Sequence, residues 1–210
     1  MPEKTKITLS DKERSLIKNT EWILTKQVII QKVYDLFADH VDTIREAFIQ
    51  TSSLPGNVRQ SVPKIYKGEN YLQLPYVIMD YPRCFEKENI FAVRTMFWWG
   101  NFFSITLHLS GIYKQFIKEN IYNTTLSALD DLFIGVNENQ WQHHFEQDNF
   151  FPVSQMDPQQ RIALFEKNDF IKLAMKFSLD QWDEMPALLN EGYKRIAGIL
   201  INYQSCEKDL

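Results

Sequence analysis

The chain is poor in the residue types that specialised sites most often need. Of its 210 residues only Cys84 and Cys206 are cysteine, and they lie far apart with no metal-ligand spacing around them. Two such thiols argue against a disulfide framework and favour a reducing, cytoplasmic compartment. The seven glycines are scattered, and Gly68, near Lys64 and Lys67, belongs to no glycine-rich phosphate loop. The sequence therefore predicts neither a cofactor nor a metal.

A basic excess and a long hydrophobic run are missing too. The chain has 23 Lys and Arg against 27 Asp and Glu, a formal net charge of −4. We expect no nucleic-acid partner, because phosphate binding needs a clustered basic face. No unbroken apolar run within residues 89–113 is longer than the four residues of Met96–Trp99, whereas a membrane span needs about 20 apolar residues. No apolar segment of the secretory type follows Met1, so we expect a soluble protein with no membrane partner.

Aromatic residues, in contrast, are abundant. They make up 14% of the chain, with 15 Phe, 9 Tyr and 5 Trp. Chains of this kind have ring-filled cores, apolar cavities, or both. A chain of 210 residues with 44% hydrophobic content buries a core without disulfide or metal staples. The simplest domain organisation is a single α+β domain over residues 1–210.

Residues 10–50 predict a long helical layer. Apolar residues recur at every seventh position, and Ser10 is placed to cap the first turn. The recurring residues are Leu16, Ile23, Ile30, Phe37 and Ile44. The positions that would complete a second apolar stripe beside this repeat are polar as far as Gln27. This favours a helix that packs on its own domain, with a break near Thr20. A coiled-coil seam between two copies of the chain stays open as the alternative.

The middle of the chain, residues 64–110, predicts an antiparallel sheet. Residues 64–67 and 71–81 have the composition of strands. Pro75 restricts the second of these strands to an edge position or a bulge, because proline donates no ladder hydrogen bond. Tyr81-Pro82 is expected to end that strand.

The most apolar stretch predicts a β-hairpin with strands 91–99 and 102–110. If Gly100-Asn101 forms a two-residue turn, Trp99 pairs with Phe102 and Val93 with His108. One face of the hairpin is then almost wholly apolar: Ala92, Arg94, Met96, Trp98, Phe103, Ile105, Leu107 and Leu109. The other face mixes rings with Thr95, Ser104, Thr106 and His108. A slip of one residue would exchange the two faces for one strand.

The C-terminal part, residues 112–205, predicts mixed α/β structure. Helical spacing of apolar residues favours helices near 112–133 and 181–203, and Asp157-Pro158 has the form of a helix start. Two segments fit either a strand or a helix: residues 140–151 and 170–179. The whole is an α+β fold in which the antiparallel sheet, joined in one version by residues 134–150, is covered by the N-terminal layer and the C-terminal helices.

Arg94 is the strongest candidate for a binding residue. It is the only formal charge in residues 89–111, and a buried guanidinium needs a carboxylate partner, for which Asp80 is the nearest choice. An arginine and His108 beside aromatic rings suit an anionic or aromatic small molecule. The predicted ligand-binding residues are Asp80, Arg83, Arg94, Thr95, Trp99, Thr106 and His108. The alternative interpretation is a structural Arg94–Asp80 ion pair and a core histidine.

Two weaker patterns have simpler explanations. His143, His144, Glu146 and Asp148 could offer metal ligands, but they match no known ligand spacing and are explained as a solvated polar face. Cys84 follows an arginine and would need a histidine base to act as a nucleophile. No recognised pattern surrounds it, and a structural thiol is the simpler explanation.

Three hypotheses for function follow. The first is a small-molecule binding or regulatory domain with a cavity beside the hairpin of residues 91–110. The second is an enzyme that uses His108 with Arg94 and a carboxylate, in a reaction that the sequence does not define. The third is a protein-interaction module that dimerises through the helix of residues 10–50, so that both a monomer and a homodimer remain open.

Overall fold

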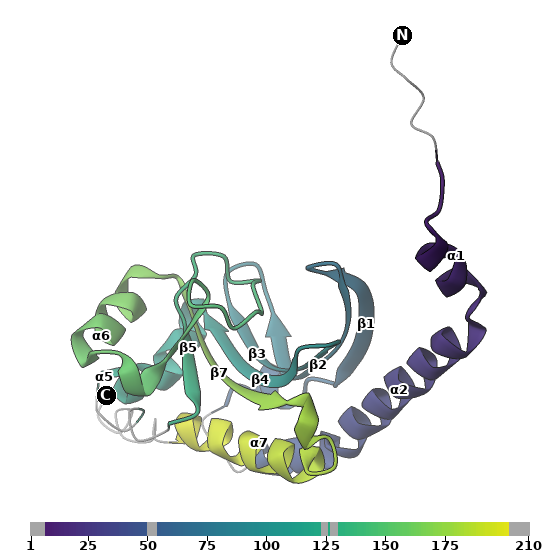
Figure 1. Ribbon diagram of the computed structural model, residues 1–210. Helices are drawn as coiled ribbons and strands as arrows, with labels where there is room; N and C mark the ends of the chain where they lie inside the picture. The colour runs from purple at the N-terminus through teal and green to yellow at the C-terminus, as the bar shows by residue number, and fades with distance from the viewer. Residues whose placement is uncertain (1–6, 50–53, 123–125, 127–129, 202–210) are drawn as a thin grey trace, which may run out of the picture.

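The computed structural model describes residues 7–49, 54–122, 126 and 130–201. They form an α+β fold, with a seven-stranded antiparallel sheet and helices in the N-terminal and C-terminal regions (Figure 1). The strands, in the order β1-β2-β3-β4-β7-β5-β6 across the sheet, are β1 (Lys64–Tyr71), β2 (Leu74–Phe85), β3 (Ile90–Trp98), β4 (Phe102–Ser110), β7 (Phe170–Ser178), β5 (Leu132–Gly135) and β6 (Phe150–Pro152). The helices are α1 (Asp11–Lys18), α2 (Thr20–Asp39), α3 (Val41–Ile49), α4 (Gly56–Arg59), α5 (Lys118–Tyr122), α6 (Pro158–Lys167) and α7 (Met185–Ile201), with short 3-10 turns η1 (Gly111–Ile117), η3 (Val153–Gln155) and η4 (Leu179–Gln181).

The predicted hairpin is present, but its register is shifted by one residue. Trp98, not Trp99, pairs with Phe102. The turn therefore has three residues and contains Gly100 at a φ of 72°, a left-handed conformation that glycine adopts without steric cost. The same shift places Ala92 opposite His108. The predicted two-residue turn is wrong, and the faces of one strand are exchanged.

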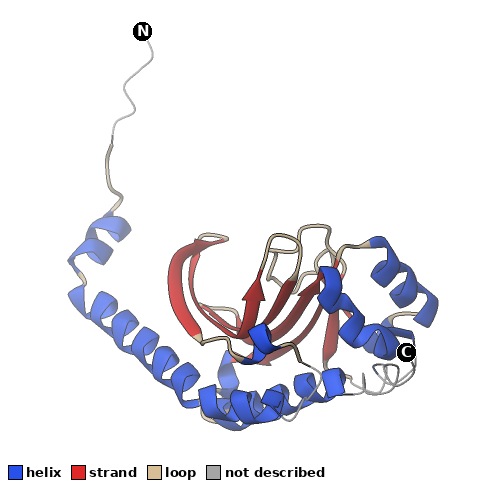
Figure 2. Ribbon diagram, turned by 180° about the vertical axis from the view of Figure 1, so that it is seen from behind, coloured by secondary structure: helices blue, strands red, loops and turns tan. Residues whose placement is uncertain are grey.

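The sheet is curved, and its two faces are covered differently (Figure 2). Helices α3 and α7 lie on the convex side and pack on an apolar layer. That layer runs across the central strands as Phe91, Val93, Phe97, Phe103, Ile105, Leu107, Leu173, Met175 and Phe177. It is the main core, and the side chains of Trp98, Met96, Ile105 and Leu107 are all buried, as the sequence predicted. Two of them, Trp98 and Met96, nevertheless lie on the concave side.

The N-terminal helical layer is only partly a layer. Ser10 caps α1 in a capping box with Glu13, and the predicted break near Thr20 is confirmed, since Asn19 caps α2. Residues 10–25 are all exposed, and the first buried side chain of α2 is Ile30. In Figure 1, α1 and the first half of α2 stand clear of the sheet. The predicted covering of the sheet by this segment is therefore correct only for its second half.

Strand β2 differs from its predicted form. It does not end at Tyr81-Pro82, which is a cis peptide bond, but continues to Phe85 with a register shift between Asp80 and Arg83. It is an interior strand, and the pairing of β1 with β2 is irregular beside Pro75. Proline is thus accommodated by the irregularity, the second of the two predicted possibilities.

In the C-terminal part, the structure decides the secondary structure of the two segments that fitted either a strand or a helix. Residues 170–178 are a strand, and β5 and β6 extend the sheet as the version with residues 134–150 predicted. Residues 140–149 are neither helix nor strand. Helix α6 begins after Asp157, which caps it, with proline at its first position. The expected helix of residues 112–133 is shorter, with η1 and α5 ending at Tyr122 and part of it outside the described residues.

Candidate functional site

The concave face is the polar side of the sheet. The antiparallel register aligns Asp80, Arg94 and Thr106 in one row across β2, β3 and β4. One row further along the strands, His108 lies opposite Lys172 of β7. Residues two apart on a strand share a face, so these side chains gather on one side. All five are buried, and the face therefore holds several ionisable groups away from water.

Arg94 is the centre of this group. Its Nε donates to Oδ1 of Asp80 at 2.7 Å and its Nη2 donates to Oδ2 at 2.9 Å, which makes a bidentate ion pair. Nη2 also donates to the hydroxyl of Tyr66 at 3.3 Å. Nη1 lies 3.1 Å from Nε2 of His143, which must be the acceptor because a guanidinium only donates. The predicted burial of Arg94 and its pairing with Asp80 are confirmed.

The connection between β5 and β6, residues 136–149, is here called the covering loop, because it folds over the concave face. Its anchor is Phe145, whose ring packs on three others. The ring centroids lie 5.0 Å from Phe102, 5.1 Å from Phe133 and 4.6 Å from Phe150. Aromatic contacts at these distances contribute beyond their buried area, so the loop is fixed to the sheet by packing as well as by hydrogen bonds.

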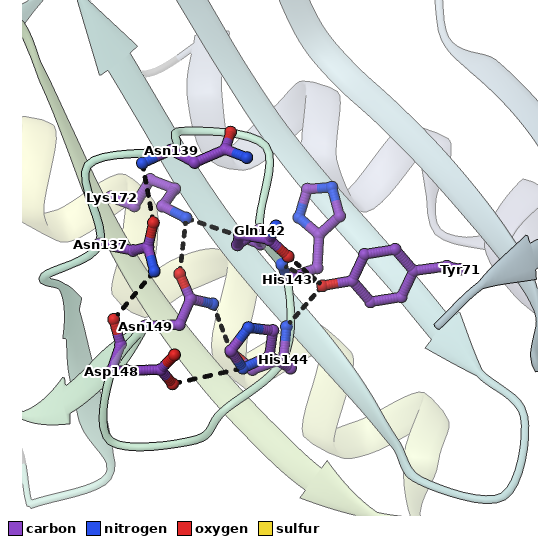
Figure 3. Close-up of polar contacts among 9 residues, drawn as sticks. All are labelled: Tyr71, Asn137, Asn139, Gln142, His143, His144, Asp148, Asn149 and Lys172. Carbon is purple, nitrogen blue, oxygen red and sulfur yellow. Dashed lines mark hydrogen bonds and ion pairs between the residues drawn. The ribbon is translucent and has the colours of Figure 1, made fainter. Parts of the chain in front are cut away.

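Tyr71, at the end of β1, ties the covering loop to the β1–β2 hairpin (Figure 3). Its hydroxyl accepts the backbone N–H of His143 at 2.7 Å and that of His144 at 3.0 Å. The same hydroxyl donates to Oε1 of Gln142 at 3.2 Å. One oxygen thus satisfies two backbone donors that no helix or strand satisfies.

Lys172 holds the other side of the loop (Figure 3). Its Nζ donates to the carbonyl of Gln142 at 2.7 Å and lies 3.4 Å from Oδ1 of Asn149, both of them neutral acceptors. The side-chain stem crosses Gly135, where an added Cβ would lie 2.9 Å from Cε of the lysine. Burial, and then the charge of Arg94, lower the pKa of Lys172 to about 7. The low-dielectric site therefore disfavours the charged form of Lys172, and near neutral pH only part of the amine is protonated.

The two histidines of the concave face are neutral. Burial, and then the charges of Lys172 and Arg94, lower the pKa of His108 to about 3. The same causes hold the pKa of His143 well below its usual value. His108 lies 3.0 Å from Oε1 of Gln140 through Nε2, and its ring meets that of Trp141 edge-on at 5.5 Å. The covering loop therefore closes over this imidazole.

A pocket of about 340 Å³ opens beside Arg94. Its surface is about as polar as it is apolar, because tyrosine side chains, Arg94 and His143 share it with Ile78, Met96 and Trp141. The lining residues are Tyr66, Tyr71, Tyr76, Ile78, Arg94, Met96, Trp141 and His143. Burial raises the pKa of Tyr66 to about 12, so its hydroxyl stays protonated. The volume lies in the lower part of the roughly 300–1,000 Å³ range of small-molecule sites, and the pocket is more polar than most of them.

The structure brings together four of the seven predicted site residues and separates three. Asp80, Arg94, Thr106 and His108 share the concave face. Thr95 lies on the convex face, where its hydroxyl meets that of Tyr193 at 2.6 Å. Trp99 lies in the hairpin turn, with its ring centroid 6.0 Å from that of Trp22. Arg83 lies beyond the register shift of β2 and donates to the carbonyl of Val62 at 3.2 Å.

Sequence reasoning missed several residues of the site. Lys172 had a weaker signal than Arg94, because it shares an otherwise apolar strand with a second lysine, Lys176. Tyr66, Tyr71 and Trp141 had no such signal. They belong to an edge hairpin and a loop whose meeting depends on the tertiary fold.

The two weaker patterns give no site. His144 is 4.0 Å from Asp148, but His143 turns to Arg94 instead. Across the described residues, no group of three or more His, Cys, Asp or Glu side chains is arranged to hold a metal. Cys84 lies 3.6 Å from the hydroxyl of Tyr113, and burial raises the pKa of its thiol, the opposite of activation. Cys206 lies outside the described residues.

In the described ranges no helix has the length and apolar character needed to span a membrane. Comparisons of the chain with protein-family models, with curated proteins and with solved structures gave no match in any of the three. Function is therefore inferred from the geometry of the concave face.

Proposed function

We propose that this is a cytoplasmic binding or regulatory protein whose concave face takes a small anionic molecule with an aromatic or other flat apolar part. The observation that carries the proposal is the pocket beside Arg94, where a ring-lined hollow meets a buried guanidinium. A pocket of that size suits a molecule with about one ring and one acidic group.

The balance of charge around the pocket supports an anion. Asp80 offsets the charge of Arg94 through the ion pair. Lys172 is partly protonated, and its hydrogen-bond acceptors are neutral, so they do not offset its positive charge. Both histidines are uncharged. The buried groups therefore carry a net positive charge, which acts strongly across a medium of low dielectric constant.

The ring-lined walls support a flat apolar part in the ligand. Tyr66, Tyr76 and Trp141 line the same pocket as Ile78 and Met96. Rings stack or meet edge-on with a bound ring at 4.5–7 Å between centroids, as they do with one another. Binding then needs no motion of the sheet, because Tyr66, Tyr76 and Met96 are held by paired strands, while Trp141 comes from the covering loop.

The geometry favours binding over the enzyme hypothesis built on His108. A base with a pKa of about 3 is a poor proton acceptor near neutral pH, where efficient general bases have pKa values near the working pH. His108 is also covered by Gln140 and Trp141 and does not line the pocket. Arg94 is held by Asp80, which suits recognition and structure better than proton transfer.

The test compares matched charged and neutral probes. Benzoate and phenyl phosphate are set against benzamide and phenol in ligand-observed NMR, with dissociation constants measured by titration. We expect the two anions to bind and the neutral analogues to bind at least about tenfold more weakly, a difference of about 1.4 kcal/mol. Equal binding of neutral and anionic probes, or binding of none, would contradict the proposal.

Two variants with a matched control locate the site. Trp141→Ala removes one wall of the pocket and should weaken benzoate binding, whereas Trp22→Ala, an equally exposed tryptophan far along the chain, should leave it unchanged. Lys172→Met replaces the buried cation by an apolar side chain of similar length. It should reduce the preference for benzoate over benzamide while the protein stays folded, since apolar replacement of a buried charge is often tolerated.

A further inference from the structure

A second pocket, of about 590 Å³, opens on the concave face of the sheet. Ile90, Ser110 and Phe170 are among the residues that line it. Ser110 pairs with Phe170 across β4 and β7, and its hydroxyl accepts the backbone N–H of Ile90 at 2.8 Å, so the three lie in one row across the strands. Ile90 lies on β3 four residues before Arg94, and residues separated by an even number share a face of a strand. The two pockets therefore lie on the same face.

Two consecutive residues of the covering loop, Gln140 and Trp141, separate the pockets and are here called the ridge. Gln140 lines the second pocket, and Trp141 lines the pocket beside Arg94. The ridge is fixed from below, because Gln140 lies 3.0 Å from Nε2 of His108 and the indole packs on the rings of His108 and Phe85. Trp141 nevertheless remains 46% exposed. A single exposed ring is ordinary on a protein surface, but this one is a fixed aromatic surface between two hollows.

The second pocket differs from the first in its charges, which sum to zero. They belong to Lys87, Glu88, Lys114 and Asp169. The amine of Lys114 is already engaged, because it donates to the backbone carbonyls of Phe165 and Asn168. Within the ranges that the structure describes, the carboxylates of Glu88 and Asp169 accept no hydrogen bond, although Asp169 lies near enough to Lys114 for their charges to attract. This pocket therefore suits a hydrogen-bond donor better than a second anionic group.

We propose that the two pockets and the ridge form one extended site for an elongated molecule with an acidic group at one end, two linked flat rings, and a hydrogen-bond donor at the other end. This inference rests on the proposed function and specifies the class of its ligand. The acidic group lies beside Arg94, the second ring crosses the indole of Trp141, and the donor reaches Glu88 or Asp169. Arg94 and Ile90 are separated by about 13 Å along β3, at about 3.3 Å per residue. Two linked rings with a substituent at each end can span that distance.

The alternative is that the second pocket is a hollow whose charges are merely solvated. Its position favours the extended site, because both pockets share one face of the sheet and meet at the same two loop residues. A one-ring acid beside Arg94 leaves the exposed part of Trp141 in water. A second ring that crosses the ridge gains an aromatic contact there, which contributes beyond the area it buries.

A series of acids of increasing length tests the extended site by isothermal titration calorimetry. The acids are benzoate, biphenyl-4-carboxylate, and the 4′-methyl and 4′-aminomethyl derivatives of biphenyl-4-carboxylate. We expect the second ring to lower the dissociation constant about tenfold, through contact with the ridge. The aminomethyl derivative should bind about tenfold more tightly than the methyl derivative, which has a similar shape but no donor.

Variants assign each step to its part of the site. Trp141→Ala should bring the dissociation constants of benzoate and biphenyl-4-carboxylate close together, whereas Trp141→Phe keeps a flat ring and should preserve much of the gain. Glu88→Gln combined with Asp169→Asn should abolish the preference for the aminomethyl over the methyl derivative. Asp183→Asn is the matched control, an exposed aspartate outside both pockets that should leave every dissociation constant unchanged.

Chemical shifts of backbone amides show where each acid lies. The aminomethyl derivative should move the signals of both Tyr76, in the first pocket, and Gly111, in the second, whereas benzoate should move only that of Tyr76. A long acid that leaves Gly111 unmoved, or that gains nothing over benzoate, would overturn the extended site and leave the proposed function standing. A gain that is unchanged in Trp141→Ala would overturn the extended site as well. Failure of all four acids to bind would overturn both.

Discussion

The two faces of the sheet are buried to a similar degree but carry different types of side chain. On the convex side, Ile105 and its neighbours are covered by helices and surrounded by apolar atoms. On the concave side, Arg94, His108 and Lys172 are covered by one irregular loop and surrounded by rings and hydrogen bonds. Burial alone therefore does not distinguish a core from a site. A residue of the core is stabilised by dispersion contacts with apolar atoms, whereas a buried group of the site depends on hydrogen bonds or ion pairs with specific partners.

The largest effect is expected where the concave face depends on a single ion pair. Arg94→Met leaves the carboxylate of Asp80 buried without its cation, and we expect the free energy of unfolding to fall by about 3–5 kcal/mol. Arg94→Met combined with Asp80→Leu should recover much of this loss, because both charges are then gone. Urea denaturation of the two variants measures it. A loss below about 1 kcal/mol in the single variant would mean that water reaches the pair.

The convex face should respond to lost volume instead of lost charge. Ile105 is fully buried, and Ile105→Ala should lower the free energy of unfolding by about 2–5 kcal/mol through lost transfer energy and a new cavity. Met96→Ala on the concave face should cost less, because it enlarges a pocket that already exists. The exposed Ile112→Ala serves as a control and should stay within about 0.5 kcal/mol. A larger loss for Met96→Ala than for Ile105→Ala would reverse the comparison of the faces.

Near neutral pH, the smallest effect is the dependence of stability on pH. The pKa of His108 is about 3 in the folded protein against 6.5 as the ordinary value, so between these pH values the unfolded chain binds more protons. Stability should therefore fall as the pH falls through this window, by up to about 1.4 kcal/mol per pH unit from this group. His108→Gln should show a shallower fall than wild type in urea denaturation below pH 6.5. Parallel curves for the two proteins would show that His108 is not shielded from water.

The sequence predicted the hairpin but not its register, and the reason is local. Trp99-Gly100-Asn101 suits a two-residue or a three-residue turn equally, because Gly100 tolerates a positive φ in either. The packing of Trp99 against Trp22, some eighty residues away in the chain, is part of what distinguishes them. A contact of that kind has no signature in the turn itself. Because of this error in register, the prediction placed Arg94 and His108 on opposite faces of the hairpin.

The ion pair, in contrast, was predictable from energetics. A single charge in an apolar stretch must find a partner, and Asp80 was the nearest available carboxylate. The covering loop was not predictable, because residues 136–149 have no periodic pattern and take their shape from Tyr71 and Lys172. The half of the site that lies on paired strands could thus be inferred from sequence, and the half that lies on the loop could not.

The hydroxyl of Tyr71 gives the covering loop a built-in reporter. The backbone amides of His143 and His144 donate to this one oxygen, which belongs to a different hairpin. Their hydrogens can exchange with deuterated water only when the loop separates from that hairpin. Their exchange rates therefore report how often the loop and the hairpin separate. Protection at these two amides should rise when a molecule occupies the pocket and fall in Tyr71→Phe. Two peptide hydrogens thereby measure how often the concave face is open to solvent.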